Sequence, residues 1–152
     1  MDTKREPLIP KEREVLEEAL HAWRQQNISW LMDTFGHISF TLDVLQMLSE
    51  AGCVIKFYQD NSFAGILLFD VGHAWWSKER ICSEEFVLAA PGVHGLQRAA
   101  IKALEDIARE YGAKLIVSGN IFQANNNLIG NGYKKAGFRQ ACATYAKEVK
   151  ET

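Results

Sequence analysis

Residues 84–119 constrain the fold of this chain more than any other stretch. The segment EEFVLAA (Glu84 to Ala90) is a short apolar run that ends at Pro91-Gly92, and KLIVSG (Lys114 to Gly119) is a second run with the character of a buried strand. Between these runs, apolar residues recur every three or four positions and polar residues fill the other face, until Gly112 ends the pattern. The stretch predicts a strand, a crossover helix and a second strand that is parallel to the first.

A βαβ unit of this kind also predicts where a ligand binds. In open α/β sheets, ligands lie beyond the carboxyl ends of the strands, where helix N-termini present unpaired N–H groups and a partial positive charge. Here that position is the turn from Pro91 to Leu96, which contains two glycines. We therefore expect an anion, and in particular a phosphate-bearing ligand, to bind there.

Composition and charge argue against several classes of protein. With 152 residues, of which 47% are hydrophobic, the chain is long enough for one domain. Its net charge of −2 argues against a nucleic-acid or membrane partner. Cys53, Cys82 and Cys142 are odd in number and far apart, which indicates neither a disulfide framework nor a metal site. The N-terminus has no apolar signal core, so we expect a soluble cytoplasmic protein.

The first third of the chain has mostly helical patterns. Residues 1–9 are polar and interrupted by proline, and we expect a loose tail there. An apolar stripe at helical spacing predicts a helix from Lys11 to about Gln26, and the less regular stretch from Asn27 to Phe40 predicts a short helix and a loop. Thr41 is the expected N-cap of a second helix, which Gly52 closes.

Strand patterns dominate the remainder. CVIKFY (Cys53 to Tyr58) and FAGILLFDV (Phe63 to Val71) flank a polar turn and predict an antiparallel hairpin. After the βαβ unit, the apolar positions predict a helix from Asn126 to Ala136, and the loose alternation from Phe138 to Val149 predicts a closing strand or strand pair. This order of elements predicts one three-layer α/β domain, residues 1–152, with a mixed sheet.

Two stretches resemble the GNAT superfamily of N-acetyltransferases. Glu84 to Ala108 is similar to the family's acyl-CoA signature, in which a strand leads through a P-x-x-R-G-x-G-x-G/A-like loop into a helix. NNLIGNGYKKAGF is similar to the second signature, N-x-x-A-x-x-L-Y-x-K-x-G-F, with matches at Asn126, Tyr133, Lys135, Gly137 and Phe138. The resemblance covers about the C-terminal half of the chain. It implies a GNAT-like fold and the transfer of an acetyl group from acetyl-CoA to an amine by direct attack.

The first signature departs from the family's pattern in its loop. When Pro91 is aligned with the family's proline, His94-Gly95 stands where Arg-Gly is usual, Gln97 replaces the next glycine, and Ala99 keeps the last small position. A register that starts at Gly92 keeps the middle glycine and loses both ends. In either register, we expect the Gln side chain to narrow or reorient the pyrophosphate cradle. Such a loop resembles those of short GNAT-like proteins of tailed bacteriophages. The missing glycines and arginine, and a helical N-terminus where the family begins with a strand, motivate the alternative: a GNAT-fold binding, assembly or inhibitor protein without acyl transfer, which by this resemblance is phage-encoded.

The candidate cofactor site combines the helix N-terminus with the end of the preceding strand. Gly95 and the N–H groups that follow it are expected to receive phosphate, with His94 and Arg98 as charge-assisted donors. The structural alternative is a simple turn after a proline. With the residues that the resemblance adds, the candidate acetyl-CoA-binding residues are Leu88, Ala89, Ala90, His94, Gly95, Leu96, Gln97, Arg98, Ala99 and Asn126.

Catalytic residues are expected on the same strand and in the second signature. By resemblance, Tyr133 stands where the family carries a tyrosine that can protonate the departing thiolate of CoA, although an aromatic residue on the inner face of a helix is equally typical of a core. An amine must lose a proton before it attacks a thioester. Glu84 and Glu85 are the candidate bases, because strand alternation places one of them on the active-site face.

The loop from Gly72 to Arg80 carries a candidate acceptor pocket. His73, Trp75 and Trp76 form an amphipathic cluster there, although paired tryptophans are also ordinary core residues. The expected acceptor is a small-molecule or peptide amine, and the sequence is compatible with a homodimer. The remaining histidines lack the ligand spacing of a metal site, so none is expected.

Overall fold

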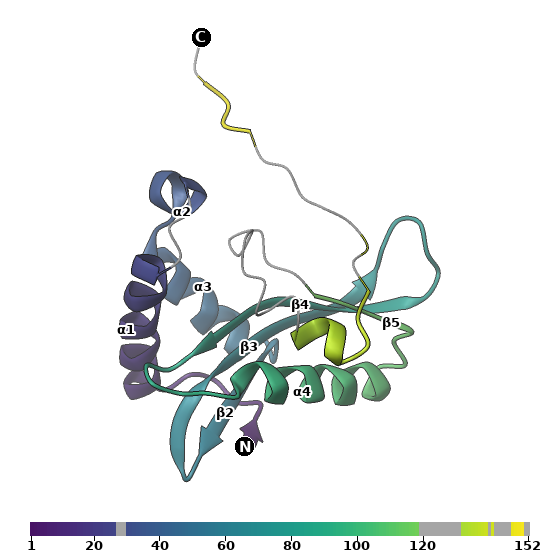
Figure 1. The fold of residues 1–152 in the computed structure, drawn as a ribbon, viewed down its shortest axis with the longest axis horizontal. Helices are drawn as coiled ribbons and strands as arrows, with labels where there is room; N and C mark the ends of the chain where they lie inside the picture. Colours follow the sequence, from purple (N-terminus) through teal and green to yellow (C-terminus); the bar gives the residue numbers. More distant parts are fainter. Residues whose placement is uncertain (27–29, 119–131, 140, 142–146, 151–152) are drawn as a thin grey trace.

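The computed structural model of the chain describes residues 1–26, 30–118, 132–139, 141 and 147–150. Within these residues, one mixed sheet runs through the molecule and helices cover both of its faces (Figure 1). The strands lie in sequence order and are β1 (Asp2–Lys4), β2 (Val54–Gln59), β3 (Ser62–His73), β4 (Arg80–Ala89) and β5 (Leu115–Val117). β4 and β5 are parallel, and the other neighbouring strands are antiparallel. The prediction of a single α/β domain with a mixed sheet is confirmed.

The helices of the described chain form the two outer layers, and they are α1 (Pro10–Gln26), α2 (Trp30–Phe35), α3 (Ile38–Glu50) and α4 (Leu96–Glu110). α4 packs on one face, where Ala100 and Leu104 contact a core that includes Phe57. α1 and α3 pack on the other face, where Leu16 and Leu45 join a second core. The three central strands, β2, β3 and β4, supply both cores because successive side chains of a strand point to opposite faces. The result is the predicted three-layer arrangement.

Most of the predicted elements are present at nearly the predicted positions. The helix predicted from Lys11 to Gln26 is α1, and the short helix predicted between residues 27 and 40 is α2. The hairpin of β2 and β3 turns at Asp60 and Asn61, whose φ values of 51° and 63° suit a tight turn between twisted strands. The βαβ unit consists of β4, α4 and β5, with β5 parallel to β4 as predicted.

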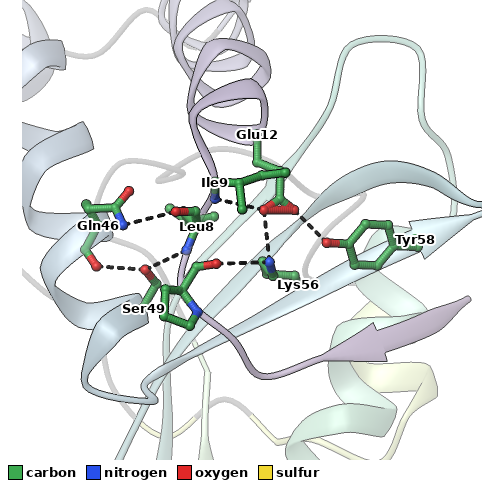
Figure 2. Close-up of polar contacts among 8 residues, drawn as sticks. Leu8, Ile9, Glu12, Gln46, Ser49, Lys56 and Tyr58 are labelled. Carbon is green, nitrogen blue, oxygen red and sulfur yellow. Dashed lines mark hydrogen bonds and ion pairs between the residues drawn. The ribbon is translucent and has the colours of Figure 1, made fainter.

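The expectation of a loose N-terminal tail is wrong. β1 pairs with β2 at the edge of the sheet, and the segment that follows is held by buried polar groups (Figure 2). Lys56 Nζ donates to the carbonyl of Pro7 at 3.0 Å, and the N–H of Leu8 donates to Ser49 Oγ at 3.0 Å. These partners lie more than forty residues away in the chain, so local sequence could not reveal that the tail is fixed.

The N-terminus of α3 also differs from the sequence prediction. α3 begins at Ile38, and its N-cap is His37, whose Nδ1 accepts a hydrogen bond from the N–H of Phe40 at 3.2 Å. Thr41 lies inside the first turn, and its hydroxyl donates to the carbonyl of His37 at 3.0 Å. An imidazole therefore does the capping expected of a threonine hydroxyl, and the helix starts earlier in the chain than predicted.

Part of the C-terminal prediction lies outside the described residues. Residues 132–135 form a helical turn that stops before Gly137, whose φ is 91°. This turn agrees with the end of the helix predicted from Asn126 to Ala136, and the beginning of that helix is not described. Of the strand or strand pair predicted from Phe138 to Val149, the described residues 138–139, 141 and 147–149 have no strand structure.

Candidate functional site

A β-bulge in β4 decides which of two adjacent glutamates enters the interior. Across from β3, Glu84 pairs with Phe69 and Phe86 pairs with Leu68, so Glu85 is an extra residue without a partner. Paired residues share a face of the sheet, and Phe69 belongs to the core beneath α4. Glu84 therefore points toward the α4 side, where it is only 7% exposed, whereas Glu85 is exposed.

The edge of β4 is open beside Glu84. Among the described residues, β5 pairs only with Ile81, Cys82 and Ser83, although β4 continues to Ala89. Residues 84–89 therefore have no described strand partner on the β5 side. Such an edge presents backbone N–H and C=O groups that an extended ligand with amide groups can use, as a peptide does when it adds to a sheet.

A groove of about 470 Å³ lies at this open edge. It extends from α1, along the second half of β4 and the turn that follows, to the first turn of α4. Because β4 is open there, the groove connects the α1 side of the sheet with the α4 side. Its lining residues are Ala19, Ala22, Trp23, Gln26, Glu84, Val87, Leu88, Ala89, Ala90, Pro91, Gly92, Val93, His94, Gly95, Leu96, Gln97 and Tyr133.

The turn before α4 has the properties of an anion site. Gly95 is the N-cap residue with a φ of 83°, a left-handed conformation that favours glycine, and no side chain caps the helix there. The start of a helix carries partial positive charge and amide N–H groups that lack intrahelical partners. A Cβ built on Gly92 or Gly95 would meet no heavy atom within 4 Å, so the turn has open space around it. A phosphate group fits this environment.

Gln97 points toward the helical turn of residues 132–135, which differs from the expectation that it narrows the phosphate cradle. A Cβ built on Gly132 would lie 2.7 Å from Gln97 Oε1 and 3.4 Å from its Nε2, so the amide group sits directly against Gly132. No such contact forms at Gly92 or Gly95. The absence of a side chain at residue 132 is what allows this close approach. Gln97 thereby connects the start of α4 to the segment that carries Tyr133.

Two hydroxyl groups hold the Glu84 carboxylate in the groove wall. Tyr133 Oη donates to Glu84 Oε1 at 2.5 Å, and Ser118 Oγ donates to Oε2 at 3.2 Å. Burial raises the pKa of Glu84 above its ordinary value of 4.5, and the two hydrogen bonds offset only part of this effect. Burial, together with the hydrogen bond to Glu84, raises the pKa of Tyr133 well above its ordinary value of 10.0. The site therefore contains a strengthened base beside a phenol that keeps its proton at neutral pH.

The structure brings most of the predicted site residues together. Leu88, Ala89, Ala90, His94, Gly95, Leu96 and Gln97 all line the groove, as do Glu84 and Tyr133. Arg98 and Ala99 lie in the first turn of α4 but do not line it, and Arg98 is exposed. Glu85 is the bulged residue and points outward, and Asn126 lies outside the described residues.

The predicted acceptor cluster lies elsewhere. His73, Trp75 and Trp76 are at the connection between β3 and β4, next to the start of β4, whereas the groove lies along its second half. Trp75 is 96% exposed and Trp76 is 62% exposed, so neither packs in a core. The structure does not bring these three residues together with Glu84 and Tyr133.

Sequence reasoning missed the α1 wall of the groove and Ser118. Ala19, Ala22, Trp23 and Gln26 recur at helical spacing, and that stripe was indistinguishable from an ordinary core face. The Trp23 ring packs edge-to-face on Phe86, which the β4 bulge turns toward the α1 side, with ring centroids 5.9 Å apart. The hydroxyl of Ser118 follows β5 directly, and no local pattern indicates its contact with Glu84.

Two negative findings apply to the described residues. They contain no group of three or more His, Cys, Asp or Glu side chains that could hold a metal ion. None of the helices in the described part of the chain is long and apolar enough to cross a membrane.

The fold has close counterparts among solved structures of acetyltransferases. A ribosomal-protein-alanine N-acetyltransferase from Brucella melitensis biovar Abortus matches with a TM-score of 0.67 at 12% identity, over 99% of this chain and 100% of that one. An acetyltransferase from Trypanosoma brucei matches with a TM-score of 0.62 at 15% identity, over 97% and 100%. An aminoglycoside acetyltransferase from an uncultured soil metagenomic sample matches with a TM-score of 0.61 at 15% identity, over 99% and 100%.

These similarities establish the fold. The chain has the fold of GNAT acetyltransferases, as the two sequence signatures imply. No protein-family model matches the sequence, and no curated protein matches it. The activity therefore has to be argued from the groove and its side chains.

Proposed function

We propose that the protein is an N-acyltransferase that moves an acetyl group from acetyl-CoA to an amine. The observation that carries the proposal is the pair formed by Glu84 and Tyr133 in the wall of the groove, at the edge where β4 has no described partner. This pair lies on the same groove as the uncapped start of α4. A base, an acid and an anion site on one groove are what acyl transfer from a phosphate-bearing thioester requires.

The groove offers a matching environment for each part of acetyl-CoA. The first turn of α4 and the exposed His94 would hold the pyrophosphate, in the open space around Gly92 and Gly95. The free edge of β4 over residues 84–89 would bind the amide groups of the pantetheine arm. When bound, acetyl-CoA supplies an activated acyl group in the form of a thioester.

Glu84 and Tyr133 take complementary roles. Glu84 accepts a proton from the attacking amine, since its raised pKa makes it a stronger base than an exposed carboxylate. Tyr133 keeps its proton at neutral pH and can give it to the sulfur that leaves. Ser118 and Gln97 orient these two groups, through a hydrogen bond to Glu84 and through contact with Gly132 respectively.

The acceptor amine would enter from the α1 side of the groove. Trp23, Ala19 and Ala22 give that wall an apolar surface, and Gln26 adds a polar group. We propose a small-molecule or peptide amine as the acceptor. Two of the matched structures are enzymes named for a ribosomal-protein alanine and for an aminoglycoside, which are both amine acceptors of these kinds.

A GNAT-fold protein without acyl transfer remains the alternative function. That function would be favoured by a groove filled with its own side chains. Instead, Gln97 is turned toward Gly132 and the phosphate turn is open, which favours the enzyme.

Isothermal titration with acetyl-CoA tests the proposal. The wild-type protein should bind acetyl-CoA, and His94→Glu should weaken binding by roughly tenfold because a negative charge at the helix start repels phosphate. Lys102→Glu is the matched control, since Lys102 is exposed on α4 and does not line the groove. It should bind acetyl-CoA as the wild type does. The absence of any heat with the wild type at millimolar acetyl-CoA would reject the proposal.

A further inference from the structure

The hydrogen bond that Tyr133 donates to Glu84 conflicts with a role for Tyr133 as the acid that protonates the leaving group. Tyr133 Oη donates its one proton to Glu84 Oε1, and Ser118 donates to the other carboxylate oxygen. A phenol has a single O–H, so this proton is engaged as long as Glu84 is ionised. If Tyr133 gave this proton to a leaving group, the buried Glu84 carboxylate would lose one of its hydrogen-bond donors. That loss costs free energy.

Protonation of Glu84 removes this obstacle. A carboxylic acid has an O–H of its own and can donate it to the oxygen of Tyr133, which is already 2.5 Å away. The hydrogen bond then runs in the opposite direction, and the O–H of Tyr133 is released to point into the groove. Both side chains line the groove, so no movement of the backbone is needed for the exchange.

We propose that Glu84 and Tyr133 form one proton relay, in which Tyr133 becomes an acid only after Glu84 has taken a proton from the acceptor amine. The proposal rests on the proposed acyl transfer. Glu84 receives one N–H proton as the nitrogen bonds to the acyl carbon. As the carbon–sulfur bond breaks, its electron pair goes to sulfur and Tyr133 gives its proton to the thiolate. Glu84 returns its proton to the oxygen of Tyr133.

The proton balance closes without any outside acid or base. A neutral amine and a thioester become an amide and a thiol, and the one proton lost by nitrogen equals the one gained by sulfur. Glu84 ends as a carboxylate and Tyr133 as a phenol, which is the state in which they began. An amine that arrives as its cation first releases an additional proton to solvent.

The surroundings of the pair are suited to such a relay. Apart from Glu84 and Tyr133, the titratable side chain that lines the groove is His94, which is exposed in the turn before α4. No lysine or arginine is among the described residues that line the groove, so none of these residues holds Glu84 ionised as a cation would. Ser118 and Gln97 are neutral neighbours, and either can keep the pair aligned in both protonation states.

The first test measures the coupling in the free protein. Carbon-13 NMR of labelled glutamate carboxyl groups follows the titration of Glu84, with Glu84→Gln used to assign its signal. Tyr133→Phe should raise the pKa of Glu84 further, because the lost hydrogen bond favoured the ionised form. Tyr58→Phe, which removes a hydroxyl that donates to the buried Glu12 at 2.6 Å, should leave the pKa of Glu84 unchanged. An unchanged pKa of Glu84 in Tyr133→Phe would overturn the relay.

The second test is a double-mutant cycle on CoA release, with a primary amine that the wild type acetylates. Glu84→Gln and Tyr133→Phe should each lower kcat about 10²-fold or more. Because the two groups act as a unit, the double variant should be no more than about tenfold below the slower single variant. Two losses that multiply to about 10⁴-fold would overturn the relay while leaving acyl transfer intact. A wild type that releases no CoA with small amines or free peptide N-termini would instead reject the proposed function and the relay with it.

Discussion

Glu12 and Glu84 are both deeply buried, but the fold shifts their pKa values in opposite directions. Glu12 in α1 is 3% exposed and Glu84 in β4 is 7% exposed, and each accepts a short hydrogen bond from a tyrosine hydroxyl. Among the described residues, Glu12 has a positively charged partner and Glu84 has none. Lys56 Nζ lies 2.9 Å from Glu12 Oε1 (Figure 2), whereas hydroxyl groups are the described partners of Glu84.

The donors around each carboxyl group, which at Glu12 include the Lys56 cation, decide whether they outweigh the effect of burial on its pKa. Burial by itself would raise the pKa of Glu12, but hydrogen bonds from Tyr58, Lys56 and the Ile9 N–H outweigh it, and the pKa is lowered. At Glu84 burial prevails and the pKa is raised. At neutral pH Glu12 is therefore an anion that ties the N-terminal segment to the sheet, whereas Glu84 takes up a proton at a higher pH than Glu12 does. This contrast is the physical reason to assign structure to one and chemistry to the other.

The largest effect should follow from removing the cation. Lys56→Met leaves Glu12 as a buried, unpaired charge, which should cost about 3–5 kcal/mol of unfolding free energy. In a chain of this size, a thermal melt should show a fall in Tm of roughly 10 °C. The double variant Lys56→Met with Glu12→Gln should recover part of the loss, since no charge remains buried. If both variants lost the same small amount of unfolding free energy, the ion pair of Lys56 and Glu12 would not be what anchors the N-terminal segment.

The two tyrosines should separate stability from turnover. Tyr133→Phe should lower CoA release about 10²-fold and should lower Tm less than Tyr58→Phe does, because Glu84 can take up a proton when it loses this hydrogen bond. Tyr58→Phe should leave turnover unchanged and cost about 1.5–3 kcal/mol, because it removes a hydrogen bond to a charged group. Melting curves and a CoA-release assay on both variants check this. If Tyr133→Phe lost stability and kept its turnover, Tyr133 would be a core residue.

The pH dependence of stability should differ in sign between the two glutamates. Glu12 has a lowered pKa in the fold, so its contribution is present above about pH 4.5 and is lost as the pH falls through the lowered value. Glu84 has a raised pKa, so the wild type loses stability as the pH rises from 4.5 through the raised value.

Melts of wild type, Glu12→Gln and Glu84→Gln between about pH 2 and pH 8 measure this difference. The cost of Glu12→Gln should shrink toward low pH. Glu84→Gln should gain stability relative to the wild type toward high pH, where the wild type has lost the contribution of the protonated carboxyl group. Parallel curves for the two variants would contradict the assignment of opposite pKa shifts.

The βαβ unit could be predicted from sequence because the hydrophobic pattern of each of its elements lies within one short stretch of the chain. The apolar stripe of α4 and the runs of β4 and β5 each specify one face or one strand, and the turn at Gly95 lies between them. β1 was missed because Asp2–Lys4 is exposed along its whole length and shows no alternation. Its place in the sheet depends on pairing with β2, which no local pattern contains.

The candidate site could be predicted only in part for a similar reason. Sequence alone narrowed the base to Glu84 or Glu85, and the β-bulge, which depends on the pairing with β3, decided between them. Ser118 and the α1 wall at Trp23 enter the groove through tertiary packing. Single residue types at ordinary spacings carry no signal for such contacts.

The most direct test of the central claim is the pH profile of CoA release for the wild type and Glu84→Gln, with the same amine. The wild-type rate should rise with pH through the titration of Glu84, above its ordinary value of 4.5. Glu84→Gln should release CoA more slowly, by about 10²-fold or more, and its rate should no longer rise with pH over the range in which Glu84 titrates. A Glu84→Gln variant with the wild-type rate and the wild-type profile would contradict the claim that this buried carboxylate is the base.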